Sequence, residues 1–265
     1  MSAVQSDTSP AGRFVPANGL AVYCEAYGGG EPVLFLHGFL STGRVWQPYV
    51  PLLSPDFTLH LPDLRGHGQT ENPGGAISTR LLAGDVAALI AALGLERPCL
   101  CGWSMGGDVA LRVARRYPDL VGKLIVGGVT LSPSDTYFAS LKAMGLDGPG
   151  QVNFERAEQA IPQLVAVWQA QHRQSPTHWK ELATQLSHDM LNPELPTDDD
   201  LRQIAAPALI VWGDRDQFLP IDDAVALYRA LPQARLAVVP NADPFVTRTH
   251  PEHFARLVRD FLLSG

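Results

Sequence analysis

Long apolar runs and a positive charge balance are both missing from this chain. No run reaches the roughly 18 apolar residues that a membrane-spanning helix needs. The formal net charge is −7 at neutral pH, which offers no basic surface to nucleic acid or to an anionic membrane. We therefore expect neither nucleic acid nor a membrane as a partner, and the oligomeric state stays open.

Cysteine is scarce and has no metal-site spacing. The only cysteines are Cys24, Cys99 and Cys101, an odd number that falls in strand-like segments without a second Cys or His pair. This pattern indicates buried reduced thiols, which are typical of a cytoplasmic protein. The start of the chain lacks the basic and apolar regions of a secretory signal, and we expect residues 1–13 to form a flexible tail.

Phosphate-binding glycine loops and metal-ligand clusters are also absent. The glycines at positions 28–30 lack the Gly-x-Gly-x-x-Gly spacing of a dinucleotide-binding loop. No other group of His, Cys, Asp or Glu has the spacing of a metal site. The sequence therefore predicts no cofactor and no metal.

The 265 residues that are present suit one large domain with a substantial core, since 46% are hydrophobic and 18% charged. Short apolar runs alternate with helical patterns, which predicts an α/β fold with a mainly parallel sheet covered by helices on both faces. The strands are expected at residues 20–26, 32–36, 57–61, 98–101, 124–129, 207–212 and 235–239. The helices are expected at residues 79–93, 107–117, 222–230 and 251–263.

The alternation stops between residues 132 and 201. This stretch is helical in composition and shows no strand-like run. We therefore predict a helical lid at 132–201, inserted into a core formed by 14–131 and 202–265.

Residues Gly102–Gly106 read Gly-x-Ser-x-Gly between a predicted strand and a predicted helix. In this context the motif is a sharp turn that exposes a serine hydroxyl at the carboxyl edge of a sheet, with the positive end of a helix behind it. Ser104 is therefore a candidate nucleophile. A plain glycine-rich turn explains the five residues equally well, so the interpretation depends on partners elsewhere in the chain.

A serine hydroxyl needs a base, an acid that orients the base, and donors for the oxyanion. One donor would be the backbone N–H of Met105, directly after the serine. The second would be the N–H of Phe39, in the loop after the strand at 32–36, where Gly38 permits close approach. Two aspartates, Asp214 and Asp216, follow a later strand and are candidates for the acid.

Four segments in this order resemble the α/β-hydrolase fold superfamily, specifically a serine esterase or lactonase with a helical lid. They are His37–Phe39, Asp63–Gly68, Gly102–Gly107 and Gly213–Asp216. The resemblance extends from about Phe14 onward and implies an eight-stranded, mainly parallel sheet. It also implies Asp216 as the triad acid, and a catalytic histidine after the last strand.

That histidine is missing. The family commonly has Asn-Ala-Gly-His-Phe at this point, and the corresponding segment here is Asn241–Phe245, with Pro244 at the position of the histidine. A proline side chain has no titratable group, so it serves neither as base nor as acid.

Three interpretations remain open. Another histidine could replace the base, the candidates being His37, His172, His178, His188, His250 and His253. The fold and pocket could persist in an inactive or repurposed protein that binds a small apolar ligand. Pro244 could also have entered an otherwise ordinary hydrolase, by chance or by design.

The sequence thus predicts hydrolysis of a small, fairly apolar ester, lactone or similar carbonyl compound, reduced or lost through Pro244. A lyase or haloperoxidase-like activity on the same fold is a further alternative. Besides the catalytic positions, the residues expected to line a pocket are His37, Trp103, Trp168 and Trp179.

Overall fold

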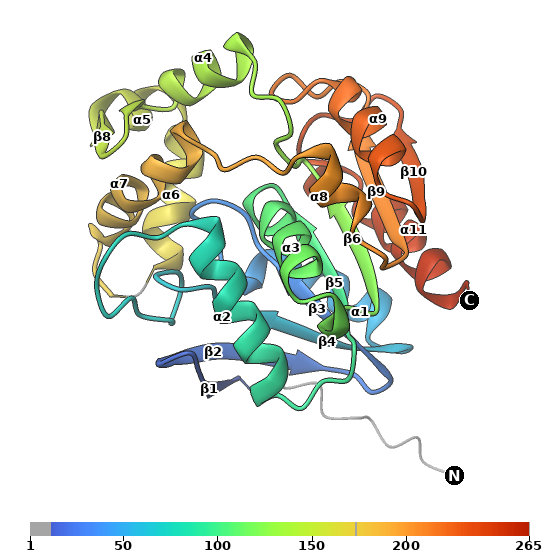
Figure 1. Cartoon of the computed structure of the whole chain (residues 1–265). Helices are drawn as coiled ribbons and strands as arrows, with labels where there is room; N and C mark the ends of the chain where they lie inside the picture. The colour runs from blue at the N-terminus through green and yellow to red at the C-terminus, as the bar shows by residue number, and fades with distance from the viewer. Residues whose placement is uncertain (1–11, 173, 265) are drawn as a thin grey trace.

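An eight-stranded sheet runs through the middle of the protein in the computed structural model, which describes residues 12–172 and 174–264 (Figure 1). Neighbouring strands from β4 to β10 run parallel, while β2 is antiparallel to both of its neighbours. In spatial order the strands are β1 (Arg13–Ala17), β2 (Leu20–Tyr27), β4 (Phe57–Pro62), β3 (Glu31–Leu36), β5 (Cys99–Trp103), β6 (Lys123–Gly127), β9 (Ala208–Gly213) and β10 (Ala234–Val239).

Strands β5 and β9 are apolar along their whole length, as expected of strands in a parallel sheet covered by helices on both faces. Every residue of β5 and of β9 is buried. The predicted α/β class and the eight-stranded sheet are confirmed. All three cysteines are free and buried, as the sequence predicts.

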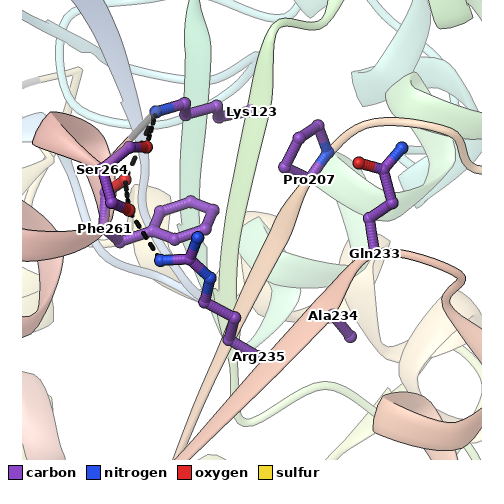
Figure 2. A pocket seen from close by; sticks show the side chains of 7 residues that line it. All are labelled: Lys123, Pro207, Gln233, Ala234, Arg235, Phe261 and Ser264. Carbon is purple, nitrogen blue, oxygen red and sulfur yellow. Dashed lines mark hydrogen bonds between the residues drawn. The ribbon is translucent and has the colours of Figure 1, made fainter.

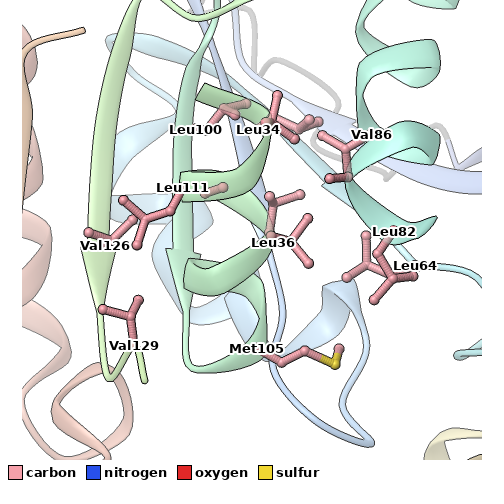
Figure 3. Close-up of a cluster of buried hydrophobic side chains, with 14 of the residues drawn as sticks. Leu34, Leu36, Leu64, Leu82, Val86, Leu100, Met105, Leu111, Val126 and Val129 are labelled. Atoms are coloured by element: carbon pink, nitrogen blue, oxygen red, sulfur yellow. The ribbon is translucent and has the colours of Figure 1, made fainter. Parts of the chain in front are cut away.

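Two apolar layers separate the sheet from its helices. On one face α2 and α3 pack on side chains such as Leu34, Leu100 and Val126 (Figure 3), and α9 packs against β9 and β10. On the other face η1, α1 and α11 pack on Phe35, Cys101 and neighbouring side chains. The helices outside the segment 132–201 are η1 (Gly43–Tyr49), α1 (Val50–Leu53), α2 (Thr79–Ala92), α3 (Met105–Arg116), η2 (Pro118–Leu120), α9 (Ile221–Ala230), α10 (Val246–Thr249) and α11 (Pro251–Leu263).

Residues 132–201, here called the inserted segment, are mostly helical. The expectation that it holds no strand was wrong, because a short antiparallel hairpin lies between two of its helices. Strands of three and two residues are too short to produce a detectable alternation. The elements are α4 (Asp135–Ala143), β7 (Leu146–Gly148), β8 (Gln151–Val152), α5 (Phe154–Ala160), α6 (Pro162–Gln171), α7 (His178–Leu191) and α8 (Asp198–Arg202).

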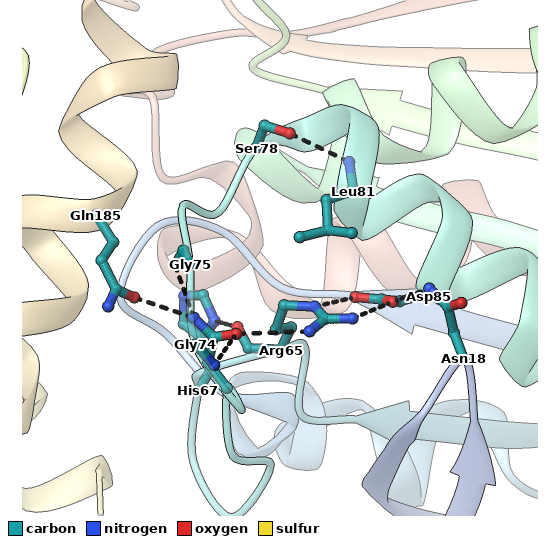
Figure 4. A network of polar contacts seen from close by, with 10 residues as sticks. Asn18, Arg65, His67, Gly74, Gly75, Ser78, Leu81, Asp85 and Gln185 are labelled. Atoms are coloured by element: carbon teal, nitrogen blue, oxygen red, sulfur yellow. Dashed lines mark hydrogen bonds and ion pairs between the residues drawn. The ribbon is translucent and has the colours of Figure 1, made fainter.

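Polar contacts join the inserted segment to the loop that precedes α2. Asp189 Oδ2 accepts the backbone N–H of Thr79 at 3.0 Å, and Gln185 contacts Asn72 at 3.3 Å. The buried ion pair between Arg65 and Asp85, at 2.7 Å, ties the same loop to α2 (Figure 4). The loop after β4 is therefore held between α2 and the inserted segment.

Strand β1 was not predicted from the apolar pattern. Only Val15 and Ala17 of its five residues are buried, and Pro16 interrupts the run. A proline is tolerated there because β1 is an edge strand, where an N–H is not required. The strand begins at Arg13, the last residue of the predicted tail, and the rest of that prediction concerns residues 1–11, outside the described part of the chain.

No helix within residues 12–172 and 174–264 is both long enough and apolar enough to cross a bilayer.

We expect Gly106→Ala to disrupt the packing of α3 on β3. A Cβ atom at position 106 would lie 2.1 Å from the Leu36 carbonyl oxygen, a backbone atom that cannot rotate away. Thermal unfolding should show a large loss of stability, because overpacking against backbone forces the helix outward. Gly84→Ala in α2 is the control: its Cβ meets nothing within 4 Å, and alanine favours a helix over glycine by up to about 1 kcal/mol. Equal melting temperatures for the two variants would contradict this account.

Asp108 is a partly buried ionisable group in the first turn of α3. Its Oδ1 accepts the backbone N–H of Thr130 at 3.1 Å. Desolvation raises the pKa of the carboxyl to about 7, opposed by the Thr130 hydrogen bond and assisted by the nearby carboxylate of Asp189.

Asp108→Asn should therefore stabilise the protein at pH 8 by several degrees of melting temperature. The pKa of Asp108 in the folded protein lies above the unfolded value of 3.8, so the ionised carboxyl destabilises the folded state at pH 8. This destabilisation decreases as the pH falls through 7, because the carboxyl then becomes protonated in the folded protein. Asparagine keeps the acceptor for Thr130 and carries no charge, and its advantage should shrink towards pH 5. Melting curves across this range, with the exposed Asp119→Asn as control, test the point. An advantage that grows in acid would contradict it.

Candidate active site

The turn between β5 and α3 holds Ser104 in an unusual backbone conformation. Its φ of 55° and ψ of −129° lie outside the regions that L-residues normally occupy. The Ser104 N–H donates to the Gly127 carbonyl at 2.9 Å, and the Ser104 carbonyl accepts the N–H of Gly107 at 2.7 Å. Strained non-glycine residues cluster at functional sites, where the surrounding structure maintains them.

The glycine at position 102 is required by the sharpness of this turn. A Cβ on Gly102 would lie 2.2 Å from the Gly106 carbonyl oxygen, because the helix folds directly back over the end of its strand. The strand, the turn and the helix are therefore those of the predicted nucleophile elbow, with Ser104 at its apex.

The loop after β3 passes directly beside Ser104. A Cβ on Gly38 would be 3.4 Å from Ser104 Cβ and 3.7 Å from Ser104 Oγ. Phe39, the second oxyanion candidate, is the next residue along this loop. Met105, the first candidate, begins α3, so its N–H has no carbonyl of a preceding helical turn to bond. The two predicted donors thus belong to segments that meet at Ser104.

Asp216 lies three residues after β9, at the same edge of the sheet. Its Oδ1 accepts two backbone N–H groups, from Phe218 at 2.8 Å and from Leu219 at 2.9 Å. Both bonds use one oxygen, which leaves Oδ2 for another donor. Desolvation raises the pKa of Asp216; those two hydrogen bonds oppose the shift, and the nearby carboxylate of Asp243 adds to it.

The segment 241–245 packs against the end of β9. The Asp214 side chain accepts the N–H of Ala242 at 3.2 Å, and the Arg215 N–H donates to the Ala242 carbonyl at 2.9 Å. A Cβ on Gly213 would lie 2.6 Å from the carbonyl oxygen of Asp243, so glycine is needed for this approach. The Asp214 carboxylate is therefore engaged in stabilising the loop.

Pro244 lies on this loop beside the elbow. Its carbonyl accepts the indole N–H of Trp103, the residue before Ser104, at 3.0 Å. The Pro244 backbone is thus tied to the residue that precedes the serine. Sequence reasoning did not foresee the Trp103 bond, since no local signal links residues 141 positions apart.

Two of the histidines considered as substitute bases have both ring nitrogens in hydrogen bonds. His37 Nδ1 donates to the Gly38 carbonyl at 3.0 Å, and His37 Nε2 accepts the N–H of Leu64 at 3.0 Å. His172 Nε2 donates to the Leu40 carbonyl, and His172 Nδ1 accepts the N–H of Gly68, both at 3.1 Å. Burial lowers the pKa of each ring to about 4. Neither ring has a free nitrogen with which to accept the serine proton.

The other four histidines considered as bases are not shown in contact with Ser104. His178 Nε2 bonds the Gly66 carbonyl at 2.8 Å, and His250 Nδ1 pairs with the Thr249 hydroxyl at 2.9 Å. His188 is exposed on α7, and His253 is half-buried in α11. None of these contacts joins a ring to Ser104.

The predicted pocket residues have different surroundings. Trp168 meets the Phe39 ring edge-on, at 6.0 Å between ring centroids, so it borders the loop after β3. Trp179 packs on Trp168 and is almost fully buried within the inserted segment. Trp103 packs on Phe254 in the core beneath α11. His37 is completely buried beneath its loop.

A depression of about 320 Å³ lies at the opposite edge of the sheet (Figure 2). It borders Lys123 and Ala234, the first residues of β6 and β10, whereas Ser104 follows the last residue of β5. Lys123 Nζ donates to three carbonyls at the end of α11, so its charge already stabilises a helix end. This depression takes no part in the site. Among the described residues, no cluster of three or more His, Cys, Asp or Glu side chains could hold a metal ion.

Comparison with known proteins gives similarity over nearly the whole chain. A 2-hydroxy-6-oxo-6-phenylhexa-2,4-dienoate hydrolase of Burkholderia cepacia is 27% identical over 289 residues, covering 97% of this chain and 98% of that protein. A pimeloyl-(acyl-carrier protein) methyl ester esterase of Aeromonas hydrophila is 28% identical over 263 residues, covering 92% and 100%. The solved structure of a thermophilic esterase from Thermogutta terrifontis superposes with a TM-score of 0.74 at 25% identity, covering 96% and 98%.

The sequence profile of the alpha/beta hydrolase family matches residues 33–257, which include Ser104, Asp216 and Pro244. The match agrees with the strand order and with the turn at Ser104. This chain belongs to the alpha/beta hydrolase family.

Proposed function

We propose that this protein is a serine hydrolase of carboxylic esters or lactones whose active site lacks only its base. Ser104 is the nucleophile, the N–H groups of Phe39 and Met105 bind the oxyanion, and Asp216 is the acid of an incomplete triad. The observation that carries the proposal is the position of Pro244. Its carbonyl bonds Trp103 next to the nucleophile, and its loop packs on the strand that leads to Asp216.

The chemistry follows from these positions. Ser104 Oγ would attack the substrate carbonyl carbon, and the negative charge on the carbonyl oxygen would be held by two backbone N–H groups. A histidine would take the hydroxyl proton and pass it to the leaving alcohol. At position 244 a proline can do neither, so in the chain as it stands the proton must go to water. Removal of one triad member still leaves about 10³- to 10⁴-fold catalysis over the uncatalysed reaction.

The substrate class follows from what surrounds the loop. The inserted segment would act as a lid, and its Trp168 places an aromatic surface against Phe39. Aromatic surface favours a small, fairly apolar carbonyl compound. The relatives named above are a dienoate hydrolase and a methyl ester esterase, which supports a carbonyl compound as the substrate.

A second function, ligand binding without catalysis, is favoured by one observation. The two histidines nearest the oxyanion loop, His37 and His172, already use both ring nitrogens. If no other group activates Ser104, the fold would serve to bind a small apolar ligand beneath the inserted segment.

Pro244→His should raise the hydrolysis of short-chain p-nitrophenyl esters by about 10³-fold or more, because it supplies the missing base between an existing nucleophile and an existing acid. The measurement is kcat/KM for both chains. Pro240→His is the matched control, since Pro240 is exposed on the same loop and should give no gain. Adding Ser104→Ala to Pro244→His should remove the gained activity. A well-folded Pro244→His variant without any gain would favour the binding function.

A further inference from the structure

We propose that His172 is a positioning residue for the loop 37–40, through which docking of the inserted segment is coupled to the geometry of the oxyanion hole. The inference rests on the proposed function for its catalytic consequence. The contacts that support it are independent of that function.

His172 holds the residue directly after the proposed oxyanion donor. Its Nε2–H donates to the carbonyl of Leu40 at 3.1 Å, and Leu40 follows Phe39. Leu40 has a φ of 50°, in the left-handed region that leucine rarely adopts, and it is completely buried. Such a backbone conformation persists only where the surrounding structure maintains it. The hydrogen bond from His172 fixes the orientation of the Leu40 carbonyl and so helps to maintain this conformation.

The same ring bonds a second loop. The N–H of Gly68, in the loop after β4, donates to His172 Nδ1 at 3.1 Å. That second loop also donates from Leu64 to His37 at the start of the segment 37–40. The loop 37–40 is therefore held at both ends. His37, at its start, bonds the loop after β4, and Leu40, at its end, is bonded by His172 of the inserted segment.

A second contact joins the same two parts of the molecule. Trp168, at the end of α6, meets the ring of Phe39 edge-on, with planes inclined at 88°. His172 follows α6 directly. One short stretch of the inserted segment thus contacts both Phe39 and Leu40, so a shift of this stretch would move the proposed donor.

The His172 bonds require a neutral ring. Nδ1 already accepts the Gly68 N–H, and a proton on that nitrogen would break the bond. Two imidazoles face His172: His67 lies 5.8 Å away between ring centroids and His178 lies 5.9 Å away. His37 lies beyond His67, and Glu181 lies 4.0 Å from His178 Nδ1. The carboxyl of Asp63 belongs to the loop that bonds His172, and its two oxygens accept the N–H groups of Gln69 at 2.9 Å and of Gly43 at 2.8 Å. Neither carboxylate forms a hydrogen bond with His172 that would stabilise its charged form.

Two substitutions separate the hydrogen bonds from the volume of the ring. His172→Phe keeps a ring and removes both bonds, whereas His172→Gln keeps a donor and an acceptor on an amide that does not titrate. His188→Phe is the control, since His188 is exposed on the same inserted segment. Each variant is made in the chain that carries Pro244 and also together with Pro244→His.

In the Pro244→His background we expect His172→Phe to lower kcat about tenfold or more while KM changes less than about threefold, because a displaced oxyanion donor acts on the transition state. His172→Gln should recover most of the loss, and His188→Phe should change neither parameter. An unchanged kcat for His172→Phe would overturn the proposal. So would a rise in KM alone, which would assign His172 to the shape of the pocket.

Hydrogen–deuterium exchange in the chain that carries Pro244 tests the positioning role without any catalysis. Peptides covering residues 38–43 should exchange faster in His172→Phe than in the wild type, and at the wild-type rate in His188→Phe. Unchanged exchange in His172→Phe would overturn the proposal even if the protein is an esterase. If Pro244→His has no esterase activity, the proposed function fails and the exchange result alone decides the role of His172.

The pH dependence of stability provides the third readout. Burial lowers the pKa of His172 to about 4 from 6.5, so the unfolded chain takes up a proton between these values that the folded chain refuses. The wild type should therefore lose melting temperature relative to His172→Gln as the pH falls from 6.5 to 4. A difference that does not change with pH would show that the ring is not held in its neutral form.

Discussion

The strained turn at Ser104 is the constraint on which the rest of the site depends. A serine at φ 55° costs on the order of 1–3 kcal/mol, and the cost is offset because α3 packs closely on β3 and β5 on either side of the turn. This close packing brings Gly38 to the serine and aims Trp103 at the loop that carries Pro244. Any relaxation of the turn would therefore separate the nucleophile from its proposed donors as well as from position 244.

The loop at position 244 keeps its place without help from a histidine. Its position depends on backbone bonds to the end of β9, on Asp214, and on the Trp103 indole. Asp243 stabilises the loop internally by accepting the N–H of Phe245 at 2.9 Å. Because none of these contacts involves an imidazole, we expect a histidine at position 244 to fit the loop with little change in the surrounding structure. The difference between proline and histidine here would then be the absence or presence of a proton acceptor.

The sequence was most informative where local pattern and burial coincide. Strands β5 and β9 and the last five residues of β3 are continuous apolar runs. The position of Pro244 was inferred from a five-residue motif that departs from the family pattern at residues 243 and 244. Strand β1 escaped prediction because it is half exposed, and the hairpin β7–β8 because it is too short. The role of His172 could not be predicted, since a lone histidine in a helical segment has no pattern that points to a carbonyl 132 positions away. Such contacts depend on tertiary packing, which the periodicity of the sequence does not reveal.

The most direct test of the central claim is the rate at which a fluorophosphonate labels Ser104, followed by intact mass and peptide mapping. This reagent needs an activated serine beside an oxyanion hole but no particular substrate. The account predicts one adduct, on Ser104, that forms slowly in the chain that carries Pro244 and about 100-fold faster or more after Pro244→His, in line with the contribution of a general base. Equal rates in the two chains, or an adduct on any other residue, would contradict the claim that this site is a hydrolase centre lacking only its base.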